Sequence, residues 1–172
     1  MKEVMVMEKV TIIKGDITYL PFHVDVIVNA ANSALVPGGG VDGAINRKAG
    51  PKLADAMLGI GGTPTGTAVY TKAYDLNADY VIHAVGPKFI DGDHGEDELL
   101  KDAYESVMKI AQKLSANSIA FPFISTGVYG YPLAEAVKIA IQTVEKFNLE
   151  AKVYFVAFDA TTEELAQKYL NN

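Results

Sequence analysis

The stretch Val26–Ile45, Val-Ile-Val-Asn-Ala-Ala-Asn-Ser-Ala-Leu-Val-Pro-Gly-Gly-Gly-Val-Asp-Gly-Ala-Ile, decides how the chain is organised. Its apolar residues up to Val28 predict a buried strand, and Asn29 is expected to end that strand. Asn32 follows two alanines, and the chain then passes through a proline into Gly38–Gly40. The stretch therefore predicts a strand, a polar corner and a glycine loop.

The glycine loop indicates a place where bare backbone approaches another molecule. Three consecutive glycines add no packing and raise the entropy cost of folding. A helix is expected to begin near Asp42, and N–H groups at the start of a helix bind anions. No basic side chain lies in the loop, which favours a backbone cradle for a phosphate. Taken alone, the stretch also fits a surface turn in which Asp42 caps a helix.

Composition limits the class of protein. The 172 residues fit a single domain, 1–172, in which residues 1–8 form a possible ragged N-terminal extension. The absence of cysteine excludes disulfides, thiolate nucleophiles and cysteine-rich zinc sites, and favours the cytoplasm. Neither a signal peptide nor an apolar run of about 18 residues is present, so we expect no membrane segment. The net charge of −6 argues against a domain that grips nucleic acid through its phosphates.

The apolar patterns alternate between strands and helices. Strands are predicted at Val10–Ile13, Val24–Val28, Thr67–Thr71, Tyr80–Ala84, Ile119–Phe123 and Val153–Phe158. Helices are predicted at Gly43–Gly50, Lys52–Leu58, Leu99–Leu114, Leu133–Phe147 and Glu163–Leu170. This alternation predicts an α/β sandwich around a largely parallel sheet.

A second glycine loop, Ser125–Pro132, follows the predicted strand Ile119–Phe123 and precedes a helix. In open α/β sheets ligands lie outside the carboxyl ends of the strands, so this loop and Gly38–Gly40 can meet over one cleft. Two such loops suggest two phosphates, although serine and threonine here can also be simple turn formers.

Several other motifs are weak. Gly38–Gly43 formally matches the dinucleotide fingerprint, but it lies far from its strand and no acidic residue ends a second strand at the required distance. The chain has neither a P-loop nor a hydrolase elbow. The acidic segment Asp91–Glu98 is expected to be a solvated loop and helix start, because Glu96 stands where a calcium loop requires glycine. The histidines His23, His83 and His94 lack metal spacing, and no metal is expected.

Three residues allow two interpretations each. His83 lies in an apolar strand and is expected to be a satisfied core or cleft-edge residue. Asp16 can stabilise its own turn or accept a hydrogen bond from a ligand amine. Phe158 ends the last strand and can belong to the core or stack on a base.

Taken together, the chain resembles the macrodomain family, and within it the bacterial and MacroD-like ADP-ribosyl hydrolases. The resemblance covers Val10 to Leu170. Its motifs, in order, are Gly15–Thr18, Asn29–Asn32, Gly38–Ile45, Val81–Pro87 and Ile124–Pro132. The resemblance implies a three-layer α/β/α sandwich with a central mixed, largely parallel sheet.

The resemblance also implies an ADP-ribose cleft. Asp16 and the backbone of Ile17 would bind adenine, and Phe158 would stack on the ring. Asn32 would bind the distal ribose. The diphosphate would be held by the two loops, through Gly38, Gly39, Gly40 and Val41 and through Ser125, Thr126, Gly127, Val128 and Tyr129, of which Tyr129 would also pack against the distal ribose.

Asp42 separates an enzyme from a binding module, because MacroD-like members carry a catalytic aspartate at this position. Its carboxylate can orient or deprotonate a water, or the ligand's diphosphate can assist that water instead. Asp42 and Asn32 are the predicted catalytic residues. Pro37 and Asn46 depart from close relatives, which have glycine and histidine there, so rate and substrate preference are the properties most affected.

The implied function is binding of ADP-ribose and hydrolysis of mono-ADP-ribose esters, either on aspartate or glutamate of modified proteins or in O-acetyl-ADP-ribose. No cofactor is expected, nucleic acid is an expected partner only as an ADP-ribosylated end, and the protein is expected to be a monomer. The alternatives are a non-catalytic ADP-ribose reader and an ADP-ribose-1''-phosphate phosphatase.

Overall fold

The computed structural model describes residues 9–171, so the possible ragged segment 1–8 lies outside the described residues. These residues form six strands: β1 (Val10–Lys14), β2 (Val24–Ala30), β3 (Ala68–Lys72), β4 (Ala78–Ala84), β5 (Ser118–Phe121) and β6 (Lys152–Ala157). The strands form one sheet in the order β1-β6-β5-β2-β4-β3. Only the β3–β4 pair is antiparallel, so the sheet is mixed and largely parallel, as predicted.

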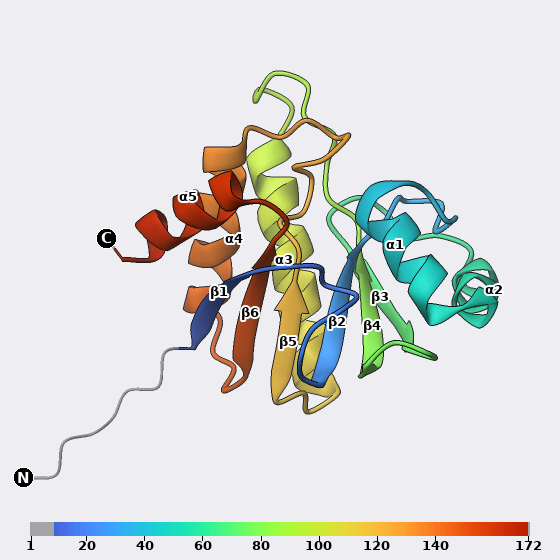
Figure 1. The fold of residues 1–172 in the computed structure, drawn as a ribbon. Helices are drawn as coiled ribbons and strands as arrows, with labels where there is room; N and C mark the ends of the chain where they lie inside the picture. Colours follow the sequence, from blue (N-terminus) through green and yellow to red (C-terminus); the bar gives the residue numbers. More distant parts are fainter. Residues whose placement is uncertain (1–8, 172) are drawn as a thin grey trace, which may run out of the picture.

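Helices cover both faces of this sheet (Figure 1). They are α1 (Gly40–Ala49), α2 (Pro51–Ile60), α3 (Glu96–Lys113), α4 (Leu133–Lys146) and α5 (Ala160–Leu170). The buried side chains of α1 and α2 belong to one hydrophobic cluster, and those of α3, α4 and α5 belong to another. The predicted three-layer α/β/α sandwich is therefore confirmed. Across the described residues, every helix is too short or too polar to cross a membrane.

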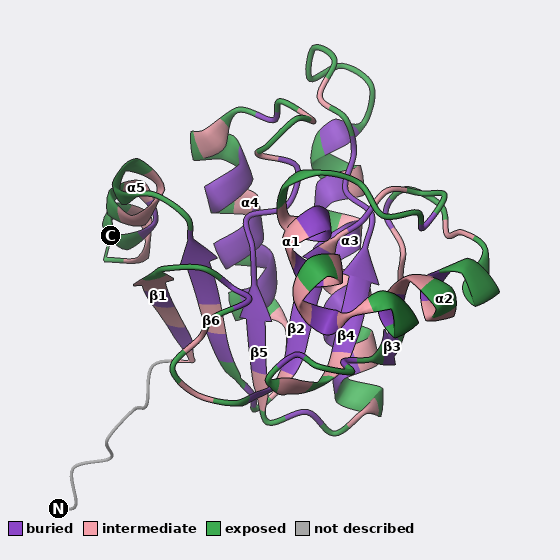
Figure 2. Cartoon of the chain, turned by 45° about the vertical axis from the view of Figure 1, so that its right-hand side comes forward, coloured by how far each residue is buried: buried purple, intermediate pink, exposed green. Residues whose placement is uncertain are grey.

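The central strands explain why the two clusters stay separate. Along β2, Val26 and Val28 pack in the cluster with α3 and α4, whereas Val24 and Ile27 pack in the cluster with α1 and α2. A parallel strand that is covered on both faces needs apolar residues on both, and Figure 2 shows these strands mostly buried.

Most predicted element ends differ from the structure by one to three residues, and two of these differences bear on the site. β2 does not end at Asn29 but continues through it to Ala30, in register with His83 and Ala84 of β4. The side-chain nitrogen of Asn29 finds partners inside the protein, whereas its buried side-chain oxygen has none among residues 9–171. Helix α1 begins at Gly40, because the N–H of Gly43 donates to the carbonyl of Gly39 at 3.2 Å. The last two glycine-loop residues therefore cap and open the helix.

The order of the strands predicts a ligand crevice at their carboxyl edge. β2 and β5 are neighbouring parallel strands. After β2 the chain enters α1 on one face, and after β5 it enters α4 on the other face. The two connections diverge at that point, where open α/β sheets bind ligands. The fold therefore places the two glycine loops beside the same crevice.

Candidate functional site

The predicted site residues gather along one edge of the sheet, because β1, β6, β5 and β2 are parallel and end there. Each strand contributes the residues that follow it: Asp16 and Ile17 after β1, Phe158 after β6, Ser125, Thr126, Gly127, Val128 and Tyr129 after β5, and Asn32, Gly38, Gly39, Gly40, Val41 and Asp42 after β2. Adjacent strands lie about 4.8 Å apart, so this edge is wide enough for an elongated ligand.

Asp42 is 3% exposed and its carboxylate is held by three donors. The amide of Asn29 donates to Oδ1 at 2.7 Å, and the amide of Asn46 donates to the same oxygen at 2.9 Å. The backbone N–H of Gly38 donates to Oδ2 at 2.8 Å. The carboxylate is therefore fixed between β2, α1 and the glycine loop.

Behind Asp42, the hydrogen-bond network continues into the sheet. Nδ2 of Asn29 also lies 3.1 Å from Nδ1 of His83, and Nε2 of His83 lies 2.9 Å from the hydroxyl of Thr71. Because Asn29 donates, Nδ1 must accept, and we assign the imidazole proton to Nε2. Burial lowers the pKa of His83 to about 4, so the ring is neutral at pH 7. The prediction of a satisfied core histidine is confirmed.

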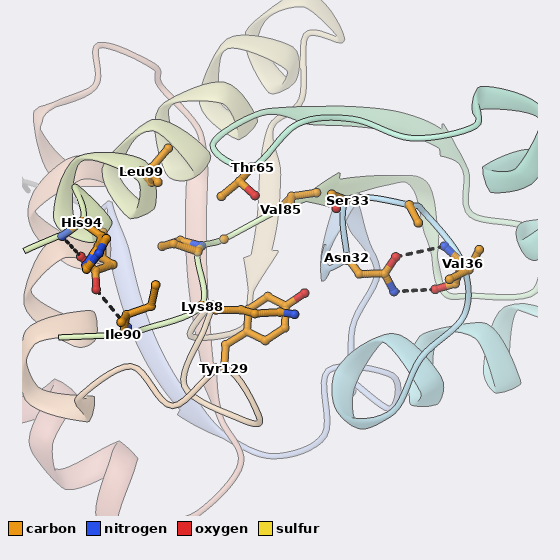
Figure 3. Close-up of a pocket in the computed structure, with 14 residues that line it drawn as sticks. Asn32, Ser33, Val36, Thr65, Val85, Lys88, Ile90, His94, Leu99 and Tyr129 are labelled. Atoms are coloured by element: carbon orange, nitrogen blue, oxygen red, sulfur yellow. Dashed lines mark hydrogen bonds between the residues drawn. The ribbon is translucent and has the colours of Figure 1, made fainter. Parts of the chain in front are cut away.

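Asn32 closes the loop that leads to the glycines. Its side-chain Nδ2 donates to the carbonyl of Val36 at 2.7 Å, and its Oδ1 accepts from the N–H of Val36 at 3.2 Å (Figure 3). A Cβ placed on Gly38 would lie 3.6 Å from this Nδ2 and 3.5 Å from Oδ2 of Asp42. The two predicted catalytic side chains therefore approach each other at Gly38.

Close packing fixes the glycine loop on its helix. A Cβ placed on Gly43 would lie 2.7 Å from the carbonyl oxygen of Gly38, which is closer than real contacts allow. A side chain at position 43 would therefore push the loop off α1. With the loop packed on α1, the exposed residues Gly39 and Gly40 lie at the start of the helix, where unpaired N–H groups favour an anion.

The loop after β5 depends on another glycine. A Cβ on Gly86 would lie 2.3 Å from Oγ of Ser125 and 2.4 Å from Cγ2 of Ile124. The absence of a side chain at Gly86, just after β4, thus leaves room for the Ser125 and Ile124 side chains. The Ser125 backbone has φ of 70°. The hydroxyl of Ser125 is buried and has no hydrogen-bond partner among residues 9–171. A ligand oxygen at this loop would satisfy it.

The other end of the edge carries the predicted adenine residues. Oδ1 of Asp16 accepts hydrogen bonds from the N–H and the hydroxyl of Thr18, at 2.9 and 2.7 Å, so Asp16 does stabilise its own turn. Ile17 is buried beneath that turn. Phe158 follows β6 and is 84% exposed, which rules out the core interpretation of this side chain.

The acidic segment Asp91–Glu98 forms the predicted loop and helix start, but one of its residues, Glu96, is not solvated. Glu96 is 1% exposed, and its carboxylate accepts the backbone N–H groups of four residues at 2.7 to 3.1 Å: Ile90, Asp91, Gly92 and His94. These hydrogen bonds lower the pKa of Glu96 to about 2. Oδ1 of Asp91 also binds Nδ1 of His94 at 2.7 Å. The three side chains cluster closely enough to share a cation, but hydrogen bonds within the loop already engage their ligand atoms.

A cavity of about 530 Å³ opens beside Asn32 and Tyr129 and extends over the end of β4 toward Lys88, Ile90 and Leu99 (Figure 3). The ammonium of Lys88 lies 5.6 Å from the centre of the Tyr129 ring. Of the predicted ligand residues, only Asn32 and Tyr129 line this cavity. It therefore lies at the end of the crevice opposite Asp16 and Phe158.

A sequence model of the Macro domain matches residues 28–140, which include both glycine loops and the Asp42 network. The chain belongs to the macrodomain family.

Similar proteins support this assignment over nearly the whole chain. This macrodomain is 51% identical over 170 residues to a protein of Escherichia fergusonii named O-acetyl-ADP-ribose deacetylase, covering 94% of this chain and 95% of that protein. A macrodomain variant of Oceanobacillus iheyensis solved with ADPR is 38% identical with a TM-score of 0.87, covering 94% of this chain and 91% of that one. The Trypanosoma brucei macrodomain in complex with ADP-ribose is 36% identical with a TM-score of 0.85, and the match covers 94% of this chain and 69% of that one.

The sequence did not identify every residue that this macrodomain uses to hold Asp42. Asn29 was interpreted as the end of a strand, but its amide is the link between Asp42 and His83. Its place directly after three apolar strand residues was the available signal, because a polar side chain inside a buried strand needs a partner. Nothing in the local sequence indicates that Gly86 contacts Ser125, since these residues are 39 positions apart.

Proposed function

We propose that this macrodomain binds ADP-ribose and hydrolyses mono-ADP-ribose esters. The observation that carries the proposal is the buried Asp42 carboxylate, which three donors hold beside the glycine loop. Burying an ionised group in this way costs free energy unless the group is fully hydrogen-bonded. An immobilised carboxylate at a ligand crevice is the arrangement expected of a residue that positions a reacting water.

The proposed ligand lies along the carboxyl edge of the sheet. Adenine would lie at the β1 and β6 end, between Asp16 and the exposed ring of Phe158. The diphosphate would lie between the two glycine loops, where backbone N–H groups favour an anion. The distal ribose would then reach Asn32 and Tyr129, next to Asp42. In this placement the scissile ester is the part of the ligand nearest the fixed carboxylate.

The proposed reaction consumes one water and one ester. The water supplies its oxygen to the carbon that the ester oxygen leaves, and the products are a free ADP-ribose hydroxyl, a carboxylate and a proton. Oδ1 of Asp42 is engaged by two amides, so Oδ2, which accepts one N–H, is the oxygen proposed to hold the water. Asn32 would orient the ribose once its amide exchanges the Val36 backbone for the ligand.

The name of the Escherichia fergusonii relative, O-acetyl-ADP-ribose deacetylase, supports the esterase over a non-catalytic reader. The reader and the ADP-ribose-1''-phosphate phosphatase would use the same crevice and are outcomes of the test below. A monomeric state and a cytoplasmic location remain predictions from the sequence.

The test is release of ADP-ribose or acetate from two substrates: a protein mono-ADP-ribosylated on glutamate, and O-acetyl-ADP-ribose. We expect Asp42→Ala to lower kcat by about 100-fold or more, the usual contribution of a positioned acid or base. ADP-ribose affinity measured by calorimetry should change by less than about tenfold, or 1.4 kcal/mol, because the binding contacts remain.

Asp55→Ala is the matched control, since Asp55 carries the same charge on the exposed side of α2. Its turnover should equal that of the wild type. Tight ADP-ribose binding without any product would instead identify a reader, and release of phosphate from ADP-ribose-1''-phosphate alone would identify the phosphatase. An equal loss of binding and turnover in Asp42→Ala would contradict the catalytic role of Asp42.

A further inference from the structure

The hydrogen-bond network behind Asp42 reaches from α1 to the edge strand β3. Asn29 of β2 lies in register with His83 of β4, and Thr71 of β3 is the diagonal neighbour of His83 across the β3–β4 pair. Since side chains alternate along a strand, these three lie on one face of the sheet. Val81, two residues before His83, packs there in the apolar cluster with α1 and α2. The network therefore crosses an apolar layer, where a polar group is costly unless it is hydrogen-bonded.

Thr71 fixes the position of the imidazole proton. Its hydroxyl donates to the carbonyl of Lys72 at 2.9 Å. A hydroxyl has one hydrogen, so the same oxygen can only accept from Nε2 of His83, which lies 2.9 Å away. The neutral ring therefore carries its proton on Nε2, and Nδ1 presents a lone pair toward β2. This is the arrangement that the amide of Asn29 requires from the other side.

The lone pair on Nδ1 of His83 fixes the amide of Asn29. Nδ2 of Asn29 has two hydrogens and an acceptor for each, Nδ1 of His83 at 3.1 Å and Oδ1 of Asp42 at 2.7 Å. The amide oxygen of Asn29 is buried and has no partner among residues 9–171, so it does not hold the side chain. A proton on Nδ1 would face the N–H groups of the amide. The amide would then turn its oxygen toward Nδ1, beside the Asp42 carboxylate, and Asp42 would lose a donor.

We infer that Thr71 and His83 are positioning residues for the reaction at Asp42. The inference rests on the proposed function and deepens the account of the same site. Thr71 keeps the proton of His83 on Nε2, and His83 in turn orients the amide of Asn29. Asn29 holds Oδ1 of Asp42, which leaves Oδ2 beside the glycine loop for the water. Neither Thr71 nor His83 belongs to the loops proposed to bind ADP-ribose, so their loss should lower turnover rather than binding.

The first test compares turnover and ADP-ribose affinity in variants of Thr71. Thr71→Val replaces the hydroxyl with a methyl group of similar size, so Nε2–H of His83 loses its acceptor. We expect kcat on O-acetyl-ADP-ribose to fall by about tenfold, and the affinity for ADP-ribose measured by calorimetry to change by less than about twofold. Thr71→Ser keeps the hydroxyl and should restore kcat to within about twofold of the wild type.

Thr143→Val is the matched control. Thr143 is 8% exposed and Thr71 is 7% exposed, but Thr143 lies on α4, which covers the opposite face of the sheet. Its kcat should equal that of the wild type. Thr71→Ala is the second variant, because it removes the hydroxyl without placing a methyl group beside the ring. It should reproduce the loss of kcat in Thr71→Val.

The second test detects the imidazole proton directly. Nitrogen chemical shifts measured by NMR distinguish a protonated from an unprotonated ring nitrogen, and the signals of His83 are identified by their loss in His83→Asn. In the wild type at pH 7 we expect the proton on Nε2. In Thr71→Val and Thr71→Ala we expect the population with the proton on Nδ1 to rise.

A proton on Nδ1 of His83 in the wild type would overturn the inference, and so would an unchanged kcat in Thr71→Val. A loss of kcat without a change of tautomer, or an equal loss in Thr143→Val, would also overturn it, because packing alone would then explain the effect. In all these cases, turnover by the wild type leaves the proposed esterase standing. Wild-type protein that turns over no ADP-ribose ester would overturn both.

Discussion

Two buried carboxylates, Asp42 and Glu96, are held in this molecule in opposite ways. Glu96 accepts four backbone N–H groups from residues 90–94, immediately before it in the sequence. Asp42 accepts from Asn29 on β2 and from Asn46 on α1, and the network continues to His83 on β4. The first set of partners is local in sequence, whereas the second exists only after the helix packs on the sheet.

The difference indicates which carboxylate is free to serve a ligand. Glu96 organises its own loop, and backbone donors cannot be removed by changing a single side chain. Asp42 is held mainly by side-chain amides, which leave its Oδ2 beside the glycine loop with one donor, Gly38. Its position therefore depends on particular residues of three elements, and single substitutions can disturb it.

The most disruptive substitution should be Asn29→Asp. The new carboxylate would face Oδ1 of Asp42 across the 2.7 Å now spanned by a hydrogen bond, in a site where both residues are buried. Two such charges cannot both ionise there without a large cost. We expect the free energy of unfolding at pH 7 to fall by about 3–5 kcal/mol, the usual range for an unpaired buried charge, and turnover to be lost.

Asn46→Asp is the matched control for this change. It places a carboxylate 2.9 Å from the same oxygen, but residue 46 is half-buried on α1 whereas Asn29 is fully buried in β2, so we expect a weaker repulsion. Denaturant unfolding at pH 7 should show a clearly smaller loss. Equal losses of stability in the two variants would mean that the deeper burial of Asn29 does not explain the effect of Asn29→Asp.

His83, which belongs to the hydrogen-bond network of Asp42, should make the stability of the protein depend on pH. Burial lowers its pKa from 6.5 to about 4, so between these values the unfolded chain binds a proton that the folded chain does not. Stability therefore falls as the pH falls from about 6.5 to about 4, by roughly 3 kcal/mol in total. His83→Asn offers a non-titrating amide oxygen to Asn29 and should remove this slope in unfolding measured from pH 4 to pH 7.

His94→Asn is the control, because Asp91 raises the pKa of His94. A raised pKa gives stability that is complete below the unfolded value of about 6.5 and lost above it, so this histidine adds no slope between pH 4 and 6.5. The wild-type slope should persist in His94→Asn. Its persistence in His83→Asn as well would show that other groups produce it.

The fold was predictable from the sequence because its signals are local. Apolar runs, glycine stops and strand–helix alternation identified all six strands and five helices of residues 9–171, with errors only at their ends. The predicted start of α1 was late because a local hydrogen bond, from Gly43 to Gly39, already closes the first turn, and the predicted end of β2 was early because Asn29 makes tertiary contacts. Asn29 pairs with His83 in the β2–β4 ladder, and its side chain contacts His83 and Asp42, which lie on other elements.

The candidate site was predictable in outline for a different reason. Parallel strands end at one edge, so residues that follow β1, β2, β5 and β6 had to come together. The roles given to Asp16, Asn32 and Phe158 came from family resemblance and stay predictions. The cavity after β4 and the contact of Gly86 with Ser125 join residues far apart in the sequence, and no local pattern records such packing.

The smallest effect should come from Glu96→Gln, which alters the carboxylate that is bound by backbone groups close to it in the sequence. The glutamine oxygen can keep some N–H donors, but its amide nitrogen would face the others, so the variant should be less stable than wild type at pH 7. Backbone hydrogen bonds lower the pKa of Glu96 to about 2, so the wild-type advantage is complete above about 4.5 and disappears as the pH falls toward 2. Unfolding measured from pH 7 to pH 2 should therefore show the stabilities of the two proteins converging.

Glu98→Gln is the control, because Glu98 is exposed in the first turn of α3; its stability should match that of the wild type throughout. If Glu96→Gln were still less stable than the wild type at pH 2, the negative charge of Glu96 would not be what stabilises the loop of residues 90–94.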